Sequence, residues 1–169
     1  MAFKTSYNAG LGQPAFNVNA VDVTPKVAIG TTLKGFDDVQ GEGSFIYLPG
    51  AANVAAGDVV TFDLLPTAPG VTRAAVASAN AGTGIAVAVV DVPAGSYGWF
   101  QVTGVAIANA IAATAVGRSF ISATAGSLTS VAAAGLQILG SRISSAVGTP
   151  AAGKVYVTLI APHVQGQIT

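Results

Sequence analysis

The chain of 169 residues contains no cysteine and only one histidine. Without cysteine it has no disulfide, no thiolate metal ligand and no thiol nucleophile. The single histidine, His163, lies in the C-terminal sequence LIAPHVQGQ, and no serine stands in a nucleophile-elbow sequence. A loop or tail histidine is therefore a better interpretation than a catalytic one. We expect that the protein is not an enzyme.

Metal ligands are equally scarce, because a transition-metal site usually needs the His or Cys side chains that are nearly missing here. The one acidic cluster, Asp37, Asp38 and Glu42, lies in the sequence GFDDVQGEG. Its spacing matches no known calcium loop, whereas Asp and Gly are typical turn residues. We therefore interpret this segment as a turn, and we expect no bound metal and no cofactor.

Charge of either sign is also rare. Charged residues make up 8% of the chain, with 7 Lys and Arg against 7 Asp and Glu, whereas an ordinary soluble domain has roughly a quarter. The basic residues are scattered singly along the sequence, and phosphate binding needs them clustered, so we expect no nucleic-acid partner. A nearly neutral, charge-poor surface tends to associate. The composition therefore favours a protein that works within an assembly.

Long apolar runs are missing as well. The most lipophilic segment, Gly104–Val116, includes Asn109 and Thr114 and is shorter than the roughly 20 apolar residues of a membrane helix. The first residues also lack the apolar core of a signal peptide. We expect no membrane partner and no secretion by that route.

What the chain does contain is a series of short apolar and β-branched runs separated by glycine and proline. Strands at roughly 8–12-residue intervals with turn signals between them are typical of a sandwich or barrel. The fold class that we predict is all-β, with a compact β-sandwich or β-barrel-like body of short strands and an extended N-terminal arm. The alanine-rich pieces at 106–115 and 131–134 are predicted as strand or loop. The expected strands are 26–34, 44–48, 59–64, 71–77, 84–90, 97–103 with 105–107, 118–122, 136–141, 143–147 and 154–160.

The first 22 residues differ from the remainder. Glycine, proline and asparagine interrupt any periodicity there, while apolar residues recur at intervals, which is typical of a tail that lies on another surface. A disordered terminus is the alternative, because chain ends are often loose. We divide the chain into an arm, 1–22, and a β-rich body, 23–169. The candidate anchors of the arm are Phe3, Tyr7, Leu11 and Phe16.

The bulkiest side chains lie in the sequence AGSYGWFQVTGVAIANA, which we predict to be a central strand with a bend or bulge at Gly104. Alternation along a strand places Tyr97 and Trp99 on one face and Phe100 on the other. Few polar groups accompany these aromatic rings, so packing in the core or at a subunit interface is favoured over sugar stacking on Trp99. The candidate residues for this packing are Tyr97, Trp99, Phe100, Val102 and Val105.

A second strand, IAVAVV at 85–90, is apolar on both faces. A strand of this kind is covered on each side by a second sheet or by a neighbouring subunit. Because alanine, glycine and valine bury little area per residue, we expect much of the stability to come from partner copies in a homo-oligomer.

The order of several short motifs resembles that in small structural proteins of tailed bacteriophages. The first half of the resemblance lies in a Gly-Thr strand, an acidic turn, an aromatic strand and an Ala-Gly-Asp-Val-Val turn. The second half begins with the Gly-Trp-Phe-Gln-Val and Gly-Val-Ala element. The matching segments are 29–31, 35–43, 45–48, 56–60, 97–102, 104–106, 124–128 and 138–142.

The resemblance implies a capsid decoration (cement) protein. Such a protein is a small β-rich oligomer, often a trimer, on the outer surface of the virion capsid, with the major capsid protein as its partner. No catalytic residues come with this family. The alternatives are a phage head-fibre or receptor-binding module and a self-assembling capsid or tail-tube subunit. Residues 1–22 lie outside the resemblance, so their contact with the shell is our own inference.

Overall fold

Antiparallel pairing between short strands builds the described part of this protein. The computed structural model describes residues 4–5, 17–65, 70–73 and 82–166. These residues form an 11-stranded sheet and contain no helix, which confirms the all-β prediction. The strands are β1 (Lys4–Thr5), β2 (Thr32–Asp37), β3 (Gly41–Pro49), β4 (Val59–Asp63), β5 (Gly70–Arg73), β6 (Gly84–Ala88), β7 (Tyr97–Asn109), β8 (Gly117–Ile121), β9 (Leu128–Thr129), β10 (Gln137–Ile143) and β11 (Lys154–Val164).

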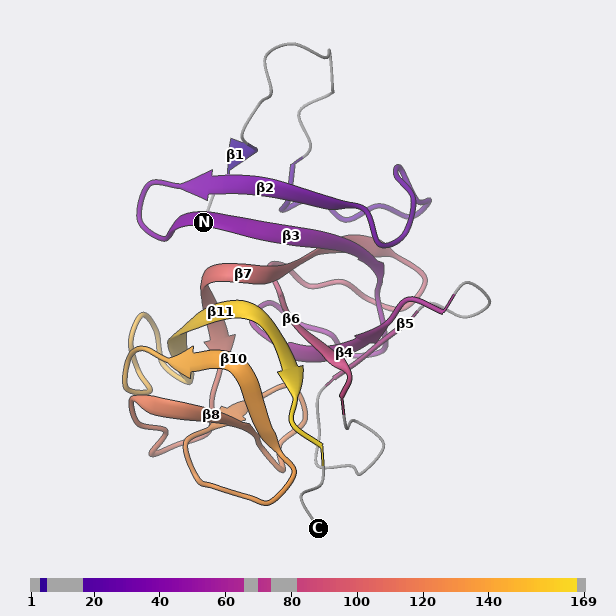
Figure 1. Ribbon diagram of the computed structural model, residues 1–169. Helices are drawn as coiled ribbons and strands as arrows, with labels where there is room; N and C mark the ends of the chain where they lie inside the picture. The colour runs from indigo at the N-terminus through magenta and orange to yellow at the C-terminus, as the bar shows by residue number, and fades with distance from the viewer. Residues whose placement is uncertain (1–3, 6–16, 66–69, 74–81, 167–169) are drawn as a thin grey trace.

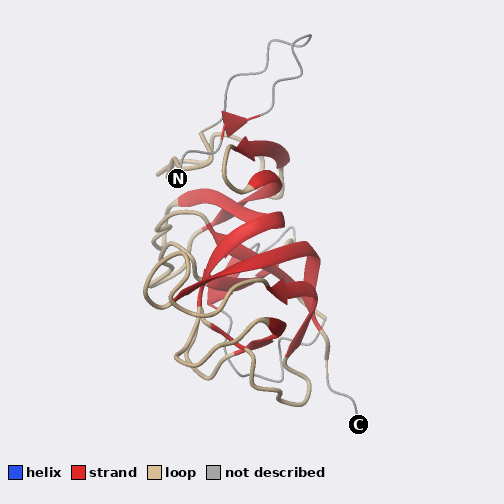
Figure 2. Ribbon diagram, turned by 90° about the vertical axis from the view of Figure 1, so that its left-hand side faces the viewer, coloured by secondary structure: helices blue, strands red, loops and turns tan. Residues whose placement is uncertain are grey.

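The sheet runs in the order β1-β2-β3-β7-β6-β11-β10-β8-β9, with β4 and β5 as a branch from β6. Figure 1 shows β1, β2 and β3 at one end of the molecule and β10 and β8 toward the other. Turned by 90°, the strands are seen stacked along the length of the molecule (Figure 2). The sheet does not close into a barrel, so of the two predicted architectures the sandwich-like body is the one observed.

Strand β7 is central to this arrangement, since it pairs with β3, β6 and β11. It also contributes to each of the three apolar clusters of the core. Trp99 packs with Val18, Phe45 and Tyr47, whereas Phe100 packs in a second cluster around β3, β4 and β6. The far end of β7 packs in a third cluster around β8, β10 and β11. The aromatic stretch is therefore the central strand that its composition predicts.

Strand β6 is buried on both faces within one chain. Ile85 and Val87 belong to one apolar cluster, and Ala86 and Ala88 to another. The alternation of side chains along a strand explains this division. The continuous apolar run predicts a strand that is covered on both faces, and in β6 both faces are covered by other strands of the same chain.

The greatest difference from the predicted strands lies near the N-terminus. The expected strand at 26–34 and turn at 35–43 are instead a hairpin in which β2 runs to Asp37 and β3 begins at Gly41. The turn is closed by Asp37, whose Oδ1 accepts hydrogen bonds from the backbone N–H of Val39 and Gln40, each at 2.9 Å. The prediction of a long turn was wrong because it counted Gly35 and Gly43 as turn residues, whereas they pair across the ladder.

Candidate interaction sites

The first candidate site is the edge of the sheet where the chain begins. Strand β1 lies antiparallel to β2, with Lys4 opposite Phe36 and Thr5 opposite Gly35 (Figure 1). An extended segment that lies on a sheet edge gains affinity from main-chain hydrogen bonds and specificity from alternate side chains. Phe36 and Val39 expose 47% and 83% of their surface, so apolar side chains accompany this edge. The edge is thus suited to pairing with extended segments.

The chain that follows the arm is fastened to the body. Val18 is completely buried against Phe45, Tyr47 and Trp99. Further along, the Asp22 N–H donates to the Tyr97 carbonyl at 2.9 Å, and the Tyr97 N–H donates to the Asp22 carbonyl at 2.8 Å. Residues 17–22 therefore lie against the body, although the sequence placed them within the arm.

A side-chain network strengthens this attachment. The buried carboxylate of Asp22 accepts a hydrogen bond from the Tyr47 hydroxyl at 2.8 Å and an ion pair from Lys26 Nζ at 2.6 Å. The Lys26 hydrogen bond, with help from that of Tyr47, lowers the pKa of Asp22 below its ordinary value despite burial. Burial, followed by the bond to Asp22, raises the pKa of Tyr47 to about 12. A neutral tyrosine and a charged aspartate are therefore held together at neutral pH. We name Asp22, Lys26 and Tyr47 the arm clasp.

The aromatic rings beside the clasp belong to the core. Tyr47 stacks on Tyr97 with ring centroids 6.2 Å apart and contacts Trp99 at 5.0 Å. Trp99 is 2% exposed, so its ring does not offer the surface platform that sugar stacking requires. Phe100 is also buried, in the neighbouring cluster.

The other predicted site residues divide into two groups. Tyr97, Val102 and Val105 are half-buried on β7, and whether a second copy covers them stays a prediction. The four arm anchors lie outside the described residues: Phe3, Tyr7, Leu11 and Phe16.

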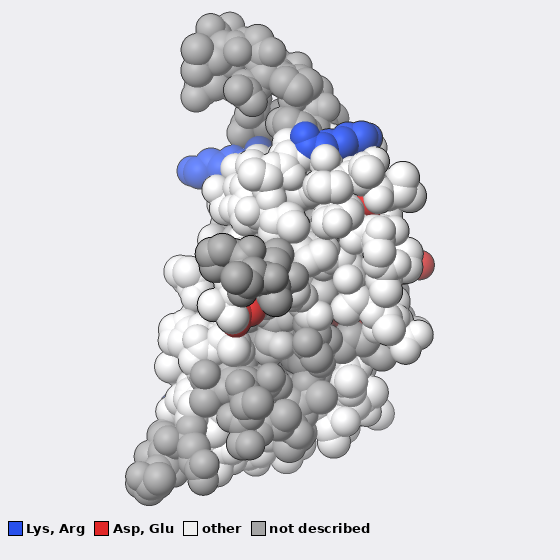
Figure 3. All heavy atoms as spheres, turned by 90° about the vertical axis from the view of Figure 1, so that its right-hand side faces the viewer, with Lys and Arg blue, Asp and Glu red and all other residues white. Residues whose placement is uncertain are grey.

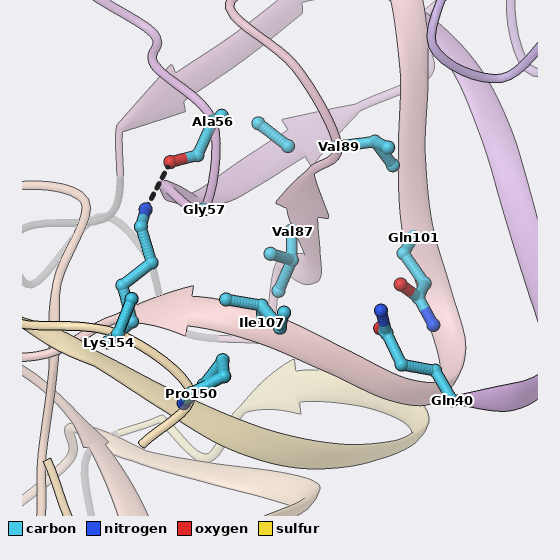
Figure 4. Close-up of a pocket in the computed structure, with 11 residues that line it drawn as sticks. Gln40, Ala56, Gly57, Val87, Val89, Gln101, Ile107, Pro150 and Lys154 are labelled. Atoms are coloured by element: carbon cyan, nitrogen blue, oxygen red, sulfur yellow. Dashed lines mark hydrogen bonds between the residues drawn. The ribbon is translucent and has the colours of Figure 1, made fainter. Parts of the chain in front are cut away.

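The second candidate site is a cleft of about 320 Å³ that is lined by residues from several distant segments of the chain. Val87, Val89 and Ile107 form its apolar wall, with Lys154 at one end and Gln101 at the other (Figure 4). The remaining lining residues are Gln40, Ala56, Gly57, Ala88, Pro150 and Ala151. A small apolar cleft with polar groups at its two ends is typical of a binding site.

Both polar ends of this cleft are held in place. Lys154 Nζ donates to the Ala56 carbonyl at 2.8 Å and to Asn109 Oδ1 at 2.6 Å (Figure 4 draws the first bond). Asn109 Nδ2 donates in turn to the buried Asp58 carboxylate at 2.8 Å. At the opposite end, the 3% exposed Gln101 donates through Nε2 to the carbonyls of Thr103 and Val105. The cleft is therefore preformed.

Sequence reasoning missed the cleft, because its polar residues come from distant segments with no shared spacing. Gln40 lies in the turn between β2 and β3, Gln101 in β7 and Lys154 at the start of β11. The only signal was the Ala-Ala-Gly-Asp turn at 55–58, whose Asp58 is buried. That signal indicates a turn and not a ligand.

The single histidine lies in a strand, whereas the sequence predicts a loop or tail position for it. His163 is exposed on β11, with its Nδ1 3.4 Å from the Ala161 carbonyl oxygen. Within the described ranges, no three His, Cys, Asp or Glu side chains come together to hold a metal ion. The part of the chain that the structure describes also contains no helix with the length and hydropathy of a membrane span.

The charged side chains are unevenly distributed on the surface. On the face shown in Figure 3, the Lys and Arg side chains gather toward the end that carries β1 and β2. Most of the remaining described surface in that view bears no charge.

Neither a scan against protein-family models nor a search of curated proteins found a match to this chain.

Proposed function

We propose that this chain is a structural virion protein of a tailed bacteriophage, which binds the outer capsid lattice as an oligomer and cements neighbouring capsid subunits. The observation that carries the proposal is the strand β1, since it brings the first residues of the chain to a sheet edge by main-chain pairing. An arm that pairs in this way with its own body has the backbone chemistry to pair with a neighbour. The motif resemblance described above supports the same function.

The body supports this role by its continuous sheet and by its surface. Its strands are linked into one sheet, and the arm clasp fixes the point at which the arm leaves the body. A charge-poor surface is suited to permanent association. Several arms in one oligomer would bind together more tightly than one, with a gain of about 10²–10⁴-fold. We therefore propose a noncatalytic clamp that opposes the outward pressure of the packaged genome, with a trimer as the favoured oligomer.

The test is an add-back experiment on capsids that lack this protein. The full chain and a variant lacking residues 1–16 are mixed with such capsids, and bound protein is measured after sedimentation. The deletion ends before Val18 and Asp22, so the buried anchor and the arm clasp are retained. We expect saturable binding by the full chain and binding at least about tenfold weaker by the truncated one. Equal binding by the two chains would refute the role of the arm.

A further inference from the structure

We propose that the cleft between Lys154 and Gln101 binds a glutamate or aspartate side chain on an extended segment of a partner protein. Three features of the cleft favour this occupant: the charge of Lys154, the small volume, and the fixed positions of the polar side chains. The inference rests on the proposed function only where it names the capsid protein as the partner. The preference of the cleft for a carboxylate does not depend on the proposed function.

The charge of the cleft comes from Lys154. An ammonium group carries three N–H donors, and the two acceptors described here, the Ala56 carbonyl and Asn109 Oδ1, are both neutral. The Asp58 carboxylate lies one hydrogen bond further away, behind Asn109. A half-buried cation beside apolar side chains gains more from a contacting anion than a fully hydrated one does. A carboxylate is therefore the group that Lys154 favours in this cleft.

The apolar wall and the volume define the remainder of the ligand. Val87, Val89 and Ile107 offer contacts to methylene groups, which is the chemistry of a glutamate stem or a short aliphatic neighbour (Figure 4). A volume of about 320 Å³ is at the lower end of the range for ligand pockets, roughly 300–1,000 Å³. The cleft thus fits one or two amino-acid residues better than a large cofactor.

Preorganisation reduces the entropic cost of binding. Lys154 is fixed by bonds to the loop at 55–58 and to the end of β7, so its ammonium does not have to be ordered by the ligand. Gln101 is fixed by two carbonyls of its own strand. The cleft also lies beside the β2–β3 turn through Gln40, close to the exposed Val39. That turn lies at the Gln101 end of the cleft, so a partner side chain entering beside it would extend along the apolar wall to reach Lys154 (Figure 4).

The experiment compares two capped pentapeptides, acetyl-Ala-Val-Glu-Val-Ala-amide and its Gln counterpart, by titration against the full-length ¹⁵N-labelled protein. We expect saturable shifts of the Gly57, Ala88 and Lys154 amides, with about fivefold tighter binding of the Glu peptide. Raised salt should reduce that preference. Equal affinities for the two peptides, or shifts elsewhere on the protein, would overturn the inference.

Two variants separate the charge from the shape of the cleft. Lys154→Met keeps the aliphatic stem and removes the ammonium, so it should lose the Glu preference, whereas Lys154→Arg should retain it. Val89→Trp fills the cleft without removing any described contact of Lys154, and it should abolish the shifts caused by both peptides. It therefore keeps the inference testable if Lys154→Met fails to fold, and unchanged peptide binding by a folded Val89→Trp variant would contradict it.

The add-back experiment distinguishes this inference from the proposed function. If the wild-type chain prefers the Glu peptide but does not bind capsids, the proposed function fails and the peptide site stands. If the wild-type chain and Lys154→Met occupy capsids equally, the capsid protein is overturned as the partner of the cleft, while the proposed function stands and the peptide titration alone decides the site.

Discussion

At the scale of single residues, Tyr47 joins the aromatic core to the arm clasp. Its ring is buried, and its hydroxyl donates to the Asp22 carboxylate and accepts the Lys26 N–H at 3.4 Å. A buried hydroxyl that donates to a charged group contributes more to stability than an exposed hydroxyl does. When the buried hydroxyl is removed, its acceptor loses a hydrogen bond that water does not readily replace. The Tyr47 hydroxyl therefore adds two hydrogen bonds to the buried Val18 and the Asp22–Tyr97 backbone pair, which also attach residues 17–26 to the body.

Tyr47→Phe removes that oxygen and keeps the ring. We expect the free energy of unfolding to fall by about 1.5–3 kcal/mol, which is the usual value of a hydrogen bond to a charged group. Urea unfolding at neutral pH measures the loss. The matched control is Tyr97→Phe on the neighbouring ring, because Tyr97 contacts Asp22 through its backbone and that contact survives the substitution. Equal losses in the two variants would show that the clasp contributes nothing specific.

The pKa of Asp22 predicts how this stabilisation depends on pH. Its folded pKa lies below the ordinary value of 3.8, so the contribution to stability is present above pH 3.8 and is lost as the pH falls through the folded pKa. We expect the stability difference between the wild type and Asp22→Asn to be constant near neutral pH and to shrink in acid.

Unfolding curves over a pH series measure that difference. Glu42→Gln is the control, because Glu42 forms an exposed ion pair with Lys34 at 3.1 Å, with the two side chains 64% and 68% exposed. An exposed pair contributes little, so its difference from the wild type should be small at every pH. A difference for Asp22→Asn that does not change with pH would contradict the assigned role of the carboxylate.

At the scale of elements, β3 and β7 approach so closely that two glycines are required. Gly104 has a φ of +88°, and a Cβ at this position would lie 2.3 Å from the Glu42 carbonyl oxygen and 2.9 Å from Gly43 Cα. A Cβ on Gly43 would lie 3.0 Å from the Thr103 carbonyl oxygen. The ladder between the strands shifts register opposite Ser44 and Phe45, next to this contact. The irregularity predicted at Gly104 therefore lies just before it, between Gln101 and Thr103, where the β3–β7 ladder skips one residue.

We predict that Gly104→Ala destabilises the protein more than Gly95→Ala does. Gly95 has a similar φ of +79°, but a Cβ there meets nothing within 4 Å. Gly95→Ala should therefore lower the free energy of unfolding by about 1 kcal/mol, which is the strain of an alanine in the left-handed backbone conformation. Gly104→Ala adds a steric clash with β3 to that strain and should lower it by at least about 3 kcal/mol. Thermal unfolding of both variants provides the comparison. Similar losses would mean that β3 moves away from β7 at little cost.

These glycines also explain how far the sequence predicts the elements. The aromatic strand, β6 and β11 are predictable because their apolar and β-branched residues are dictated by burial within the sheet. The hairpin of β2 and β3 is not, since Gly35 and Gly43 have the composition of a turn but pair within a ladder. What requires Gly43 is the approach of β7, which lies some 60 residues away in the chain. The cleft is unpredictable for the same reason, because its polar residues meet only in the folded chain.

At the scale of the whole molecule, the core consists mainly of small side chains. Alanine and valine account for many of the buried apolar residues, and each buries modest area at about 25 cal/mol per Å². The described surface is also poor in charge in the view of Figure 3. Both features favour a body that is stabilised by association with other copies.

We therefore predict that unfolding depends on protein concentration. If the native protein is a trimer, dilution should lower its melting temperature and shift its sedimentation toward smaller species. Scanning calorimetry and analytical ultracentrifugation over the same dilution series provide the measurement. A melting temperature that does not change, together with a monomer at every concentration, would contradict the predicted homo-oligomer.

The central claim is that this chain cements a capsid lattice, and a cryo-electron microscopy reconstruction of the native phage particle tests it most directly. We predict density for the β-rich body at the three-fold positions on the outer surface of the capsid, with residues 1–16 extended across a subunit boundary. Density for this chain only in the tail tube or in a fibre, with none on the shell, would contradict the claim.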